Sequence, residues 1–183
     1  MKRLVALLVP ALFSAVPAAS LSAQAAAPAA KAEDVASVDA VIKTLYDVIS
    51  GPAGQKRDWN RFRSIFAPGA RLIPTGRDAA GKARIAAVWT PDEYANTVGG
   101  RLEEGGFFET EIGRTMEQYG NIVQVFSAYD SKRTAADPKP FARGINSIQL
   151  FNDGTRWWIV SIFWEGETPS NPIPAKYLHA GKH

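Results

Sequence analysis

The sequence has 183 residues, 46% of them hydrophobic, and a formal net charge of +3 at pH 7. This length and composition predict one globular domain rather than two domains or a disordered chain. The chain has no cysteine, which excludes disulfides, thiolate metal sites, cysteine nucleophiles and lipidated cysteines. Its two histidines, His179 and His183, lie in the terminal tail, so serine–histidine catalysis and histidine-based metal sites lack their key residues. No glycine motif for phosphate or dinucleotide binding follows a strand, so we expect no metal and no cofactor.

The first 25 residues have the order of a secretory signal peptide. Lys2 and Arg3 precede an apolar run over residues 4–13, and a small-residue region ends at Ala23-Gln24-Ala25. A short membrane anchor is the alternative, but this run is well below the roughly 20 residues that a membrane span needs, and proline interrupts it. We therefore expect residues 1–25 to be cleaved off and the protein to be periplasmic or secreted.

Removal of the signal peptide lowers the net charge. Without its two basic residues the chain has 19 basic and 18 acidic residues, a net charge of +1. No later segment concentrates lysine and arginine, so we expect neither nucleic acid nor, after signal cleavage, a membrane as partner. Residues 26–34 are predicted to be a disordered alanine- and proline-rich spacer, residues 35–166 the domain, and residues 167–183 an extended C-terminal segment.

Three helices are predicted in the first part of the domain. Apolar residues recur at helical spacing over residues 38–50, after a serine that can cap the helix. A shorter helix follows Asp58. The third begins with a capping box at residues 90–93, with proline at the first helical position, and runs to about Glu104. Gly99-Gly100 inside this helix indicates a kink or a close approach of another segment.

Period-two alternation of apolar residues predicts strands in the remaining segments. Asp153-Gly154, flanked by β-branched and aromatic residues, predicts a hairpin with a tight two-residue turn. The expected strands cover residues 70–74, 85–89, 107–114, 121–129 and the two arms of the hairpin 141–165. This order predicts an α+β fold, in which three N-terminal helices pack on the concave face of a curved, mainly antiparallel sheet.

A two-residue turn would fix the register of this hairpin, with Leu150 opposite Trp157 and Asn146 opposite Ser161. One face of the hairpin would then carry Asn146, Ile148, Leu150, Trp157, Ile159, Ser161 and Phe163. The other face would carry an apolar stripe that includes Trp158, Val160, Ile162 and Trp164. No helix remains to cover that stripe, so we expect a homodimer through this outer sheet face. The alternative is that the proline-rich C-terminal segment folds back over it.

Two sequence patterns resemble the nuclear transport factor 2-like (NTF2-like) superfamily, which includes ketosteroid isomerase and the SnoaL-like cyclases. They are Phe62-x-x-x-Phe66-Ala67-Pro68-Gly69-Ala70, which leads into the first strand, and Asp153-Gly154-x-x-Trp157-Trp158-Ile159-Val160. The resemblance implies a cone around a pocket and frequent dimers through the outer sheet face. Tyr46 matches the first-helix tyrosine of the isomerase pattern, but the first strand, residues 71–74, has no acid where that pattern has its base. The superfamily hosts enzymes, transport factors and binding domains.

The expected register also suggests a site. Gln124 would lie beside Asn146, and with Ser161 these would form a polar row on the inner face, with Glu109 and Glu111 on the same side. Buried polar groups cost about 1–3 kcal/mol each unless they are paired, so they either satisfy one another or meet a ligand. We expect Glu111, with a pKa raised by burial, and Tyr46 as the candidate catalytic residues.

Tryptophans supply the candidate apolar walls. Trp59, Trp89 and Trp157 either fill the core or line a ligand pocket. Two function classes therefore stay open. One is an exported domain that binds a small, partly apolar molecule, and the other is a cofactor-independent lyase, isomerase or hydrolase that uses Glu111 or Tyr46.

Overall fold

The computed structural model of the chain describes residues 28–178. The expected signal peptide lies outside the described residues. Helices and strands follow in the expected order, with an additional short helix before the first long one and a 3-10 turn near the C-terminus. The helical elements are α1 (Ala32–Val35), α2 (Val38–Ile49), α3 (Trp59–Ser64), α4 (Pro91–Gly105) and the 3-10 turn η1 (Ala175–Tyr177). The strands are β1 (Phe66–Arg77), β2 (Ala83–Ile85), β3 (Phe108–Tyr119), β4 (Ile122–Lys132), β5 (Ala142–Asn152) and β6 (Trp157–Gly166).

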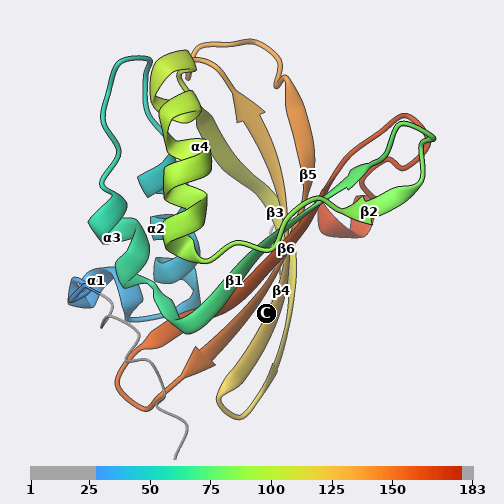
Figure 1. Ribbon diagram of the computed structural model, residues 1–183. Coiled ribbons are helices and arrows are strands. Elements are labelled where there is room, and N and C mark those ends of the chain that lie inside the picture. Colours follow the sequence, from blue (N-terminus) through green and yellow to red (C-terminus); the bar gives the residue numbers. More distant parts are fainter. Residues whose placement is uncertain (1–27, 179–183) are drawn as a thin grey trace, which may run out of the picture.

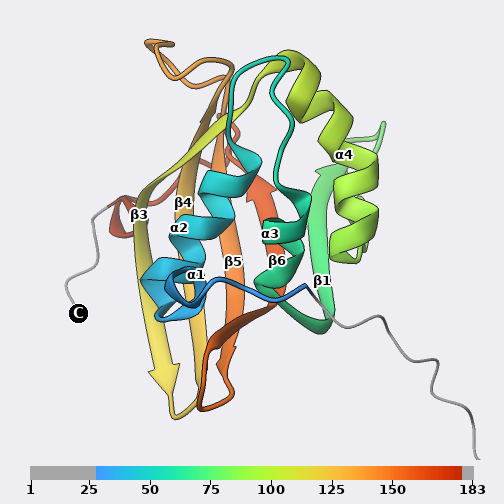
Figure 2. The same ribbon diagram turned by 90° about the vertical axis from the view of Figure 1, so that its left-hand side faces the viewer.

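The strands form one sheet in the order β2-β1-β6-β5-β4-β3, antiparallel except for the parallel pair β1–β6. Helices α2, α3 and α4 lie across one face of the curved sheet (Figure 1). In the turned view all three lie in front of the strands, so this face is the inner one (Figure 2). The α+β class and the curved, mainly antiparallel sheet are therefore confirmed. No helix within the described part of the chain is both long and apolar enough to cross a membrane.

Local signals account for the helix ends. The Ser37 hydroxyl accepts the backbone N–H of Ala40 at 3.1 Å and caps α2. Thr90 and Glu93 form the predicted capping box at the start of α4. A Cβ at Gly99 would lie 2.7 Å from the ring of Trp59, so the glycine allows α3 and α4 to approach closely.

The ordered chain begins earlier than expected. Helix α1 begins at Ala32, inside residues 26–34, which we expected to be a disordered spacer. Asp34 is buried there and accepts hydrogen bonds from Thr44 at 3.1 Å and from Arg61 at 2.6 and 2.8 Å. The ion pair ties α1 to α3 and the hydrogen bond from Thr44 ties it to α2, and composition alone reveals neither contact.

The turn of the β5–β6 hairpin is longer than the expected two residues. Asp153 Oδ1 accepts the backbone N–H groups of Thr155 and Arg156 at 2.8 and 2.9 Å, which closes a four-residue loop, and Asn152 pairs with Trp157. The pairing is therefore shifted by two residues from the expected one. An even shift keeps side chains on their faces, so Trp157 stays on the inner side as expected.

A β-bulge at Val160 reverses the second half of β6. Leu150 pairs with Ile159, but the next pair is Gln149 with Ser161, so Val160 is an extra residue. Beyond it the alternation is opposite to the expected one. Ile162 is buried and Trp164 lines the interior, whereas Ser161 and Phe163 lie on the outer face. The expected inner position of Ser161 and the expected outer positions of Ile162 and Trp164 were therefore wrong.

The register of β4 against β5 also differs from the expected one. Asn146 pairs with Ser127 rather than with Gln124, and Gln124 pairs with Gln149. The shift is three residues, and an odd shift changes the face. Gln124 is therefore exposed on the outer side, while its neighbours Val123 and Val125 are in the core.

The C-terminal segment folds back over the outer face of the sheet. The ring of Tyr177 stacks on that of Phe126 with centroids 5.5 Å apart. Gly113 makes this approach possible, since a Cβ there would lie 2.4 Å from the carbonyl oxygen of Tyr177. The segment covers only part of the face. At the turns beyond it, the apolar side chains that stay exposed are Tyr119, Ile122, Phe151 and Val160.

Candidate functional site

A cavity of about 300 Å³ lies between the inner face of the sheet and helices α2, α3 and α4. Small-molecule sites start at about this size. Tyr94 of α4 is central to its wall, with ring centroids 5.4 Å from Phe62, 6.0 Å from Trp89 and 6.4 Å from Trp164. The aromatic side chains that line the cavity are Phe62, Trp89, Tyr94, Phe107, Tyr129, Phe141 and Trp164. They are spread over residues 62–164, so the cavity exists only in the folded chain.

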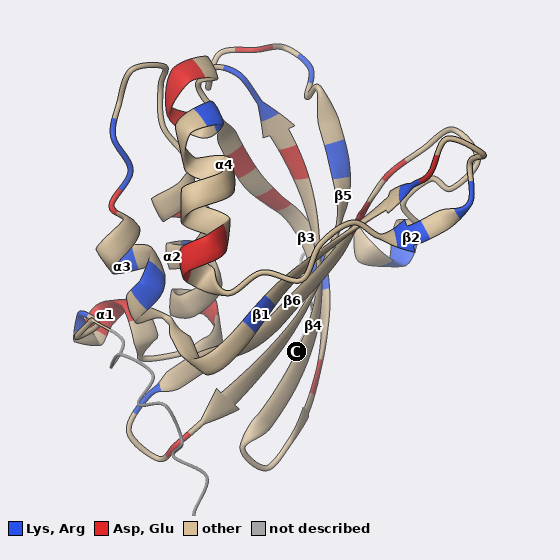
Figure 3. Cartoon of the chain, in the orientation of Figure 1, with Lys and Arg blue, Asp and Glu red and all other residues tan. Residues whose placement is uncertain are grey.

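Besides the tyrosines, three polar side chains line this apolar space, and Glu109 is the ionisable one. Glu109 comes from the inner face of β3, opposite Ser131 of β4. Its carboxylate accepts hydrogen bonds from Ser131 Oγ at 3.0 Å and from Asn146 Nδ2 at 3.4 Å. Acidic segments of β3 appear in red behind α4 (Figure 3). The cavity therefore has one polar corner in a largely aromatic wall.

Burial raises the pKa of Glu109 from its ordinary value of 4.5 to about 7. The hydrogen bonds from Ser131 and Asn146 favour the ionised form, but they offset only part of the desolvation. Near neutral pH the carboxyl is therefore present in both protonation states. Such a group can donate a hydrogen bond, accept one, or transfer a proton.

A chain of hydrogen bonds connects this corner with the surface. Asn146 Nδ2 donates to the Tyr46 hydroxyl at 3.1 Å, and that hydroxyl lies 2.7 Å from Ser127 Oγ. Ser127 donates to Glu111 Oε1 at 2.6 Å, and Glu111 forms an ion pair with Arg114 at 2.9 Å. Arg114 also pairs with the exposed Asp39 at 2.7 Å. This chain fixes the side chain of Asn146 and, through it, one oxygen of Glu109.

The tyrosines around the site stay protonated. Burial raises the pKa of Tyr46 well above its ordinary value of 10, and the nearby Glu109 raises it further. Burial likewise raises the pKa values of Tyr94 and Tyr129, with the same carboxylate as a second cause. All three hydroxyls are therefore hydrogen-bond donors at physiological pH and not bases.

Some of the expected site residues meet at this cavity. Trp89 and Asn146 line it. Trp59 lies behind the wall, where its Nε1 donates to Glu103 at 3.0 Å and its ring contacts Phe62. Trp157 packs against the hydrophobic core outside the cavity lining.

Other expected residues lie elsewhere. Gln124 and Ser161 are on the outer face, where Ser161 hydrogen-bonds to Gln149. Glu111 faces inward as expected, but it does not line the cavity. Its carboxylate accepts a hydrogen bond from Ser127 and forms an ion pair with Arg114. Tyr46 is buried in the hydrogen-bond chain and acts on the cavity only through Asn146.

Several lining residues were not predicted as site residues. The β3 alternation placed Glu109 on the same face as Glu111, but the choice between them depends on Arg114, which pairs with one and not the other. Trp164 was missed because the bulge at Val160 has no sequence signal. Tyr94 was also missed. It directly follows the capping box of α4, and its position on the inner side of that helix is the signal that could have identified it as a lining residue.

Within residues 28–178 no group of three or more histidine, cysteine, aspartate or glutamate side chains could hold a metal ion. Every fully buried side-chain nitrogen and oxygen in this part of the chain has a hydrogen-bond partner. The polar corner is therefore preorganised, and its cavity side is open to a ligand.

Comparisons with known proteins identify the fold. No protein-family model matches the sequence, and no curated protein matches it. A protein with a cystatin-like fold from Nostoc punctiforme is 14% identical, with 75% of this chain and 92% of the other covered and a TM-score of 0.53. An NTF2-like protein from Silicibacter pomeroyi is 16% identical, with coverage of 72% and 94% and a TM-score of 0.50. The Kfla4162 protein from Kribbella flavida is 8% identical, with coverage of 73% and 90% and a TM-score of 0.51. The chain therefore has the NTF2-like fold, and at these identities the likeness concerns the fold alone.

Proposed function

We propose that the protein binds a small, largely apolar molecule in the cavity between α4 and the sheet. The observation that supports this is the combination of an aromatic lining with one preorganised polar corner at Glu109. Ligand sites typically join a mostly apolar wall with a few placed polar groups. A ligand hydroxyl or carbonyl at that corner would meet a carboxyl that both donates and accepts hydrogen bonds near neutral pH.

Proton transfer at Glu109 is the second candidate function. A carboxyl with a pKa of about 7 in a largely aromatic cavity is suited to general acid–base catalysis. This favours a cofactor-independent lyase, isomerase or hydrolase in which Glu109, and not Glu111, transfers the proton. Tyr46 then serves as a positioning residue, because its hydroxyl reaches Glu109 only through Asn146.

The binding proposal is tested by filling the cavity. Val98 of α4 lines it, and Val98→Trp should lower the affinity for apolar ligands about tenfold or more, since overpacking costs about 1–3 kcal/mol. The same substitution at Val88, which is 54% exposed, is the control and should leave affinity unchanged. Calorimetry with phenylbutanol and phenylbutanamide measures both. If neither compound binds the wild type, or if both variants bind alike, the cavity is not the site.

Catalysis is tested separately from binding. In deuterium oxide the wild-type protein should accelerate the exchange of hydrogen for deuterium in an apolar ketone such as cyclohexanone, at the carbons next to the carbonyl. The rate should rise through about pH 7 as Glu109 ionises. Glu109→Gln should abolish the acceleration and leave phenylbutanol binding within about threefold. Nuclear magnetic resonance follows the exchange. Equal rates in both proteins would leave binding as the function.

We also propose that the protein acts after export, in the periplasm or outside the cell. The support is the order of a basic start, a short apolar run and Ala23-Gln24-Ala25. Mass spectrometry of the periplasmic fraction should find Ala26 or a near neighbour at the N-terminus. Intact Met1 in soluble cytosolic protein would contradict export.

A further inference from the structure

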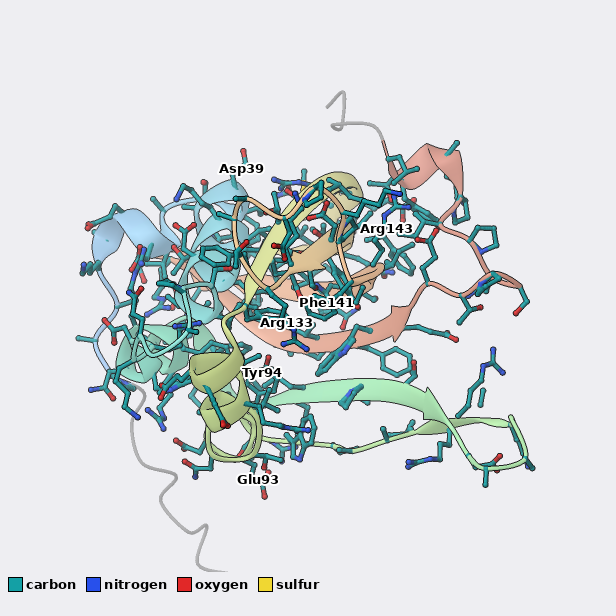
Figure 4. The ribbon with its side chains drawn as sticks, turned by 90° about the horizontal axis from the view of Figure 1, so that it is seen from above. Asp39, Glu93, Tyr94, Arg133, Phe141 and Arg143 are labelled. Carbon is teal, nitrogen blue, oxygen red and sulfur yellow. The ribbon has the colours of Figure 1, made fainter. Side chains whose placement is uncertain are left out.

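One basic side chain lies at the outer rim of the cavity. Arg133 directly follows β4, and its guanidinium carbon lies 4.2 Å from the ring centroid of Phe141. Phe141 lines the cavity, is 51% exposed, and its ring lies 6.2 Å from that of Phe107, another lining residue. Seen from above, Arg133 and Phe141 lie next to each other (Figure 4). Phe107 and Phe141 line the cavity, and Arg133 lies against the half-exposed ring of Phe141.

The backbone holds Arg133 close to the last turn of α4. A Cβ at Gly106 would lie 2.6 Å from the carbonyl oxygen of Arg133, and the φ of Gly106 is +66°, so glycine is required there. A Cβ at Gly105 would lie 3.5 Å from Arg133 Nη1, which places the guanidinium beside the end of α4. Asp137 accepts the backbone N–H groups of Arg133 and Thr134 at 3.0 and 3.1 Å and fixes the loop.

The guanidinium of Arg133 has no carboxylate within ion-pair distance and no hydrogen-bond acceptor among residues 28–178. Its contact with Phe141 places the guanidinium carbon over the ring and is not a hydrogen bond. The N–H groups of the guanidinium therefore remain available for a partner. Arginine presents these groups as a planar fork that fits the two oxygens of a carboxylate.

The contact with Phe141, a lining residue, places Arg133 at the cavity. Ser131, two residues earlier, faces inward and donates to Glu109. Arg133 comes two residues after Ser131, directly beyond the end of β4. Lys132, between them, faces the opposite side of the strand. The cavity thus has a polar corner inside and a free cation at its rim.

We propose that Arg133 binds an anionic end of the ligand, and that the ligand is a small apolar acid with a terminal carboxylate. Its apolar body would lie among Tyr94, Trp89 and Trp164, with the carboxylate at the mouth. This inference rests on the proposed binding function and specifies the class of ligand. The competing role for Arg133 is purely structural: it stacks on Phe141 and supplies the positive charge that the last turn of α4 lacks.

Two compounds of equal shape separate these roles. Calorimetry should find that phenylbutanoate binds the wild type about fivefold more tightly than phenylbutanamide, as expected for a partly solvated ion pair of about 1 kcal/mol. Arg133→Gln should abolish that preference and leave the amide affinity unchanged. Lys132→Gln removes the same charge from the neighbouring residue on the other side of the strand, and should keep the preference.

The opposite results overturn the inference in distinguishable ways. If the acid and the amide bind the wild type equally, or if Arg133→Gln weakens both alike, Arg133 is structural and only the binding proposal survives. An equal loss of preference in Lys132→Gln would indicate general electrostatic attraction. If neither compound binds, the proposed function and this inference are both rejected. Should Arg133→Gln fail to fold, Arg133→Lys keeps the charge without the fork and should reduce the preference, and in the wild type the preference should shrink with added salt.

Discussion

The two faces of the same sheet differ in how they treat polar and apolar side chains. On the inner face, polar groups lie among apolar ones, and each finds a partner: Glu109 with Ser131, and Asn146 with Tyr46. On the outer face, apolar side chains next to the turns lie open to solvent, and Tyr119 is 85% exposed. Only the part near η1 is covered, by the C-terminal segment.

The difference lies in how many parts of the chain each contact joins. Contacts on the inner face join distant segments, whereas an exposed side chain on the outer face belongs to one strand. The hydrogen bond between Tyr46 and Ser127 joins residues 81 positions apart, and the one between Asn146 and Tyr46 joins residues 100 positions apart. Loss of one partner leaves another buried group unpaired, so substitutions there should affect several elements. An exposed side chain on the outer face has no such dependants.

The largest contrast is expected at adjacent positions of β6. Ile162 is 4% exposed, and Ile162→Ser should lower the free energy of unfolding by about 3–5 kcal/mol through lost packing and a buried hydroxyl. Phe163→Ser, on the outer face, should cost less than about 1 kcal/mol. Urea unfolding of the two variants measures both values. The reverse order would mean that the bulge at Val160 is absent and the regular alternation is correct.

The next effect concerns the pH dependence of stability. The folded protein binds the proton of Glu109 more tightly than the unfolded chain does, because burial raises its pKa from 4.5 to about 7. Unfolding therefore releases a proton in this range, and this group's contribution to stability is greatest below pH 4.5 and falls as the pH rises to 7. At about 1.4 kcal/mol per pH unit the loss amounts to at most about 3.5 kcal/mol.

Glu109→Gln should remove this slope. Urea unfolding from pH 4 to 8 compares the two proteins, and the difference between them should grow in favour of the variant between about pH 4.5 and 7. Glu117→Gln changes an exposed residue of the same strand and should leave the wild-type slope intact. A slope that persists in Glu109→Gln would locate the titrating group elsewhere.

A smaller effect is expected for the hydroxyl of Tyr46. Tyr46→Phe leaves Ser127 and Asn146 each without one partner, and should lower the free energy of unfolding by about 1–3 kcal/mol. The matched control Tyr119→Phe removes an exposed hydroxyl and should change it by less than about 0.5 kcal/mol. Equal values for the two would show that the inner network contributes no more than the surface does.

The smallest effect on folding stability is expected for a substitution at Val160, which should instead change the oligomeric state. The homodimer stays a prediction, but its expected residues change: Trp158 and Val160 are on the outer face, whereas Ile162 and Trp164 are not. The exposed residues Tyr119, Ile122 and Phe151 take their place. Val160→Glu should turn a dimer into a folded monomer in sedimentation experiments, with about 0.5 kcal/mol or less change in the stability of the monomer. A wild type that is monomeric at micromolar concentration would contradict the dimer.

The helices and the order of strands could be predicted because their signals are local. The cap at Ser37 and the capping box at Thr90 act within one helical turn. Alternation then identified the strands, and the resemblance to the NTF2-like superfamily gave the correct fold. Helix α1 was missed because its stability depends on the ion pair between Asp34 and Arg61.

The site could be predicted only in part because it depends on strand register. Asn146 was placed correctly, since a shift by two residues and the bulge both leave it on the inner face. Gln124 and Ser161 were misplaced by odd shifts, which reverse a face. Glu111 was favoured over Glu109 because the sequence does not reveal that Arg114 folds back onto it.

The bulge at Val160 also bears on how the length of this chain can vary. Removal of one residue from a strand normally reverses every side chain that follows and turns the core face outward. At Val160 the extra residue is unpaired, so its deletion would restore regular alternation and leave Ile162 and Trp164 facing inward. Chains of this fold that have one residue fewer at this point should align with a gap there and keep the same cavity lining.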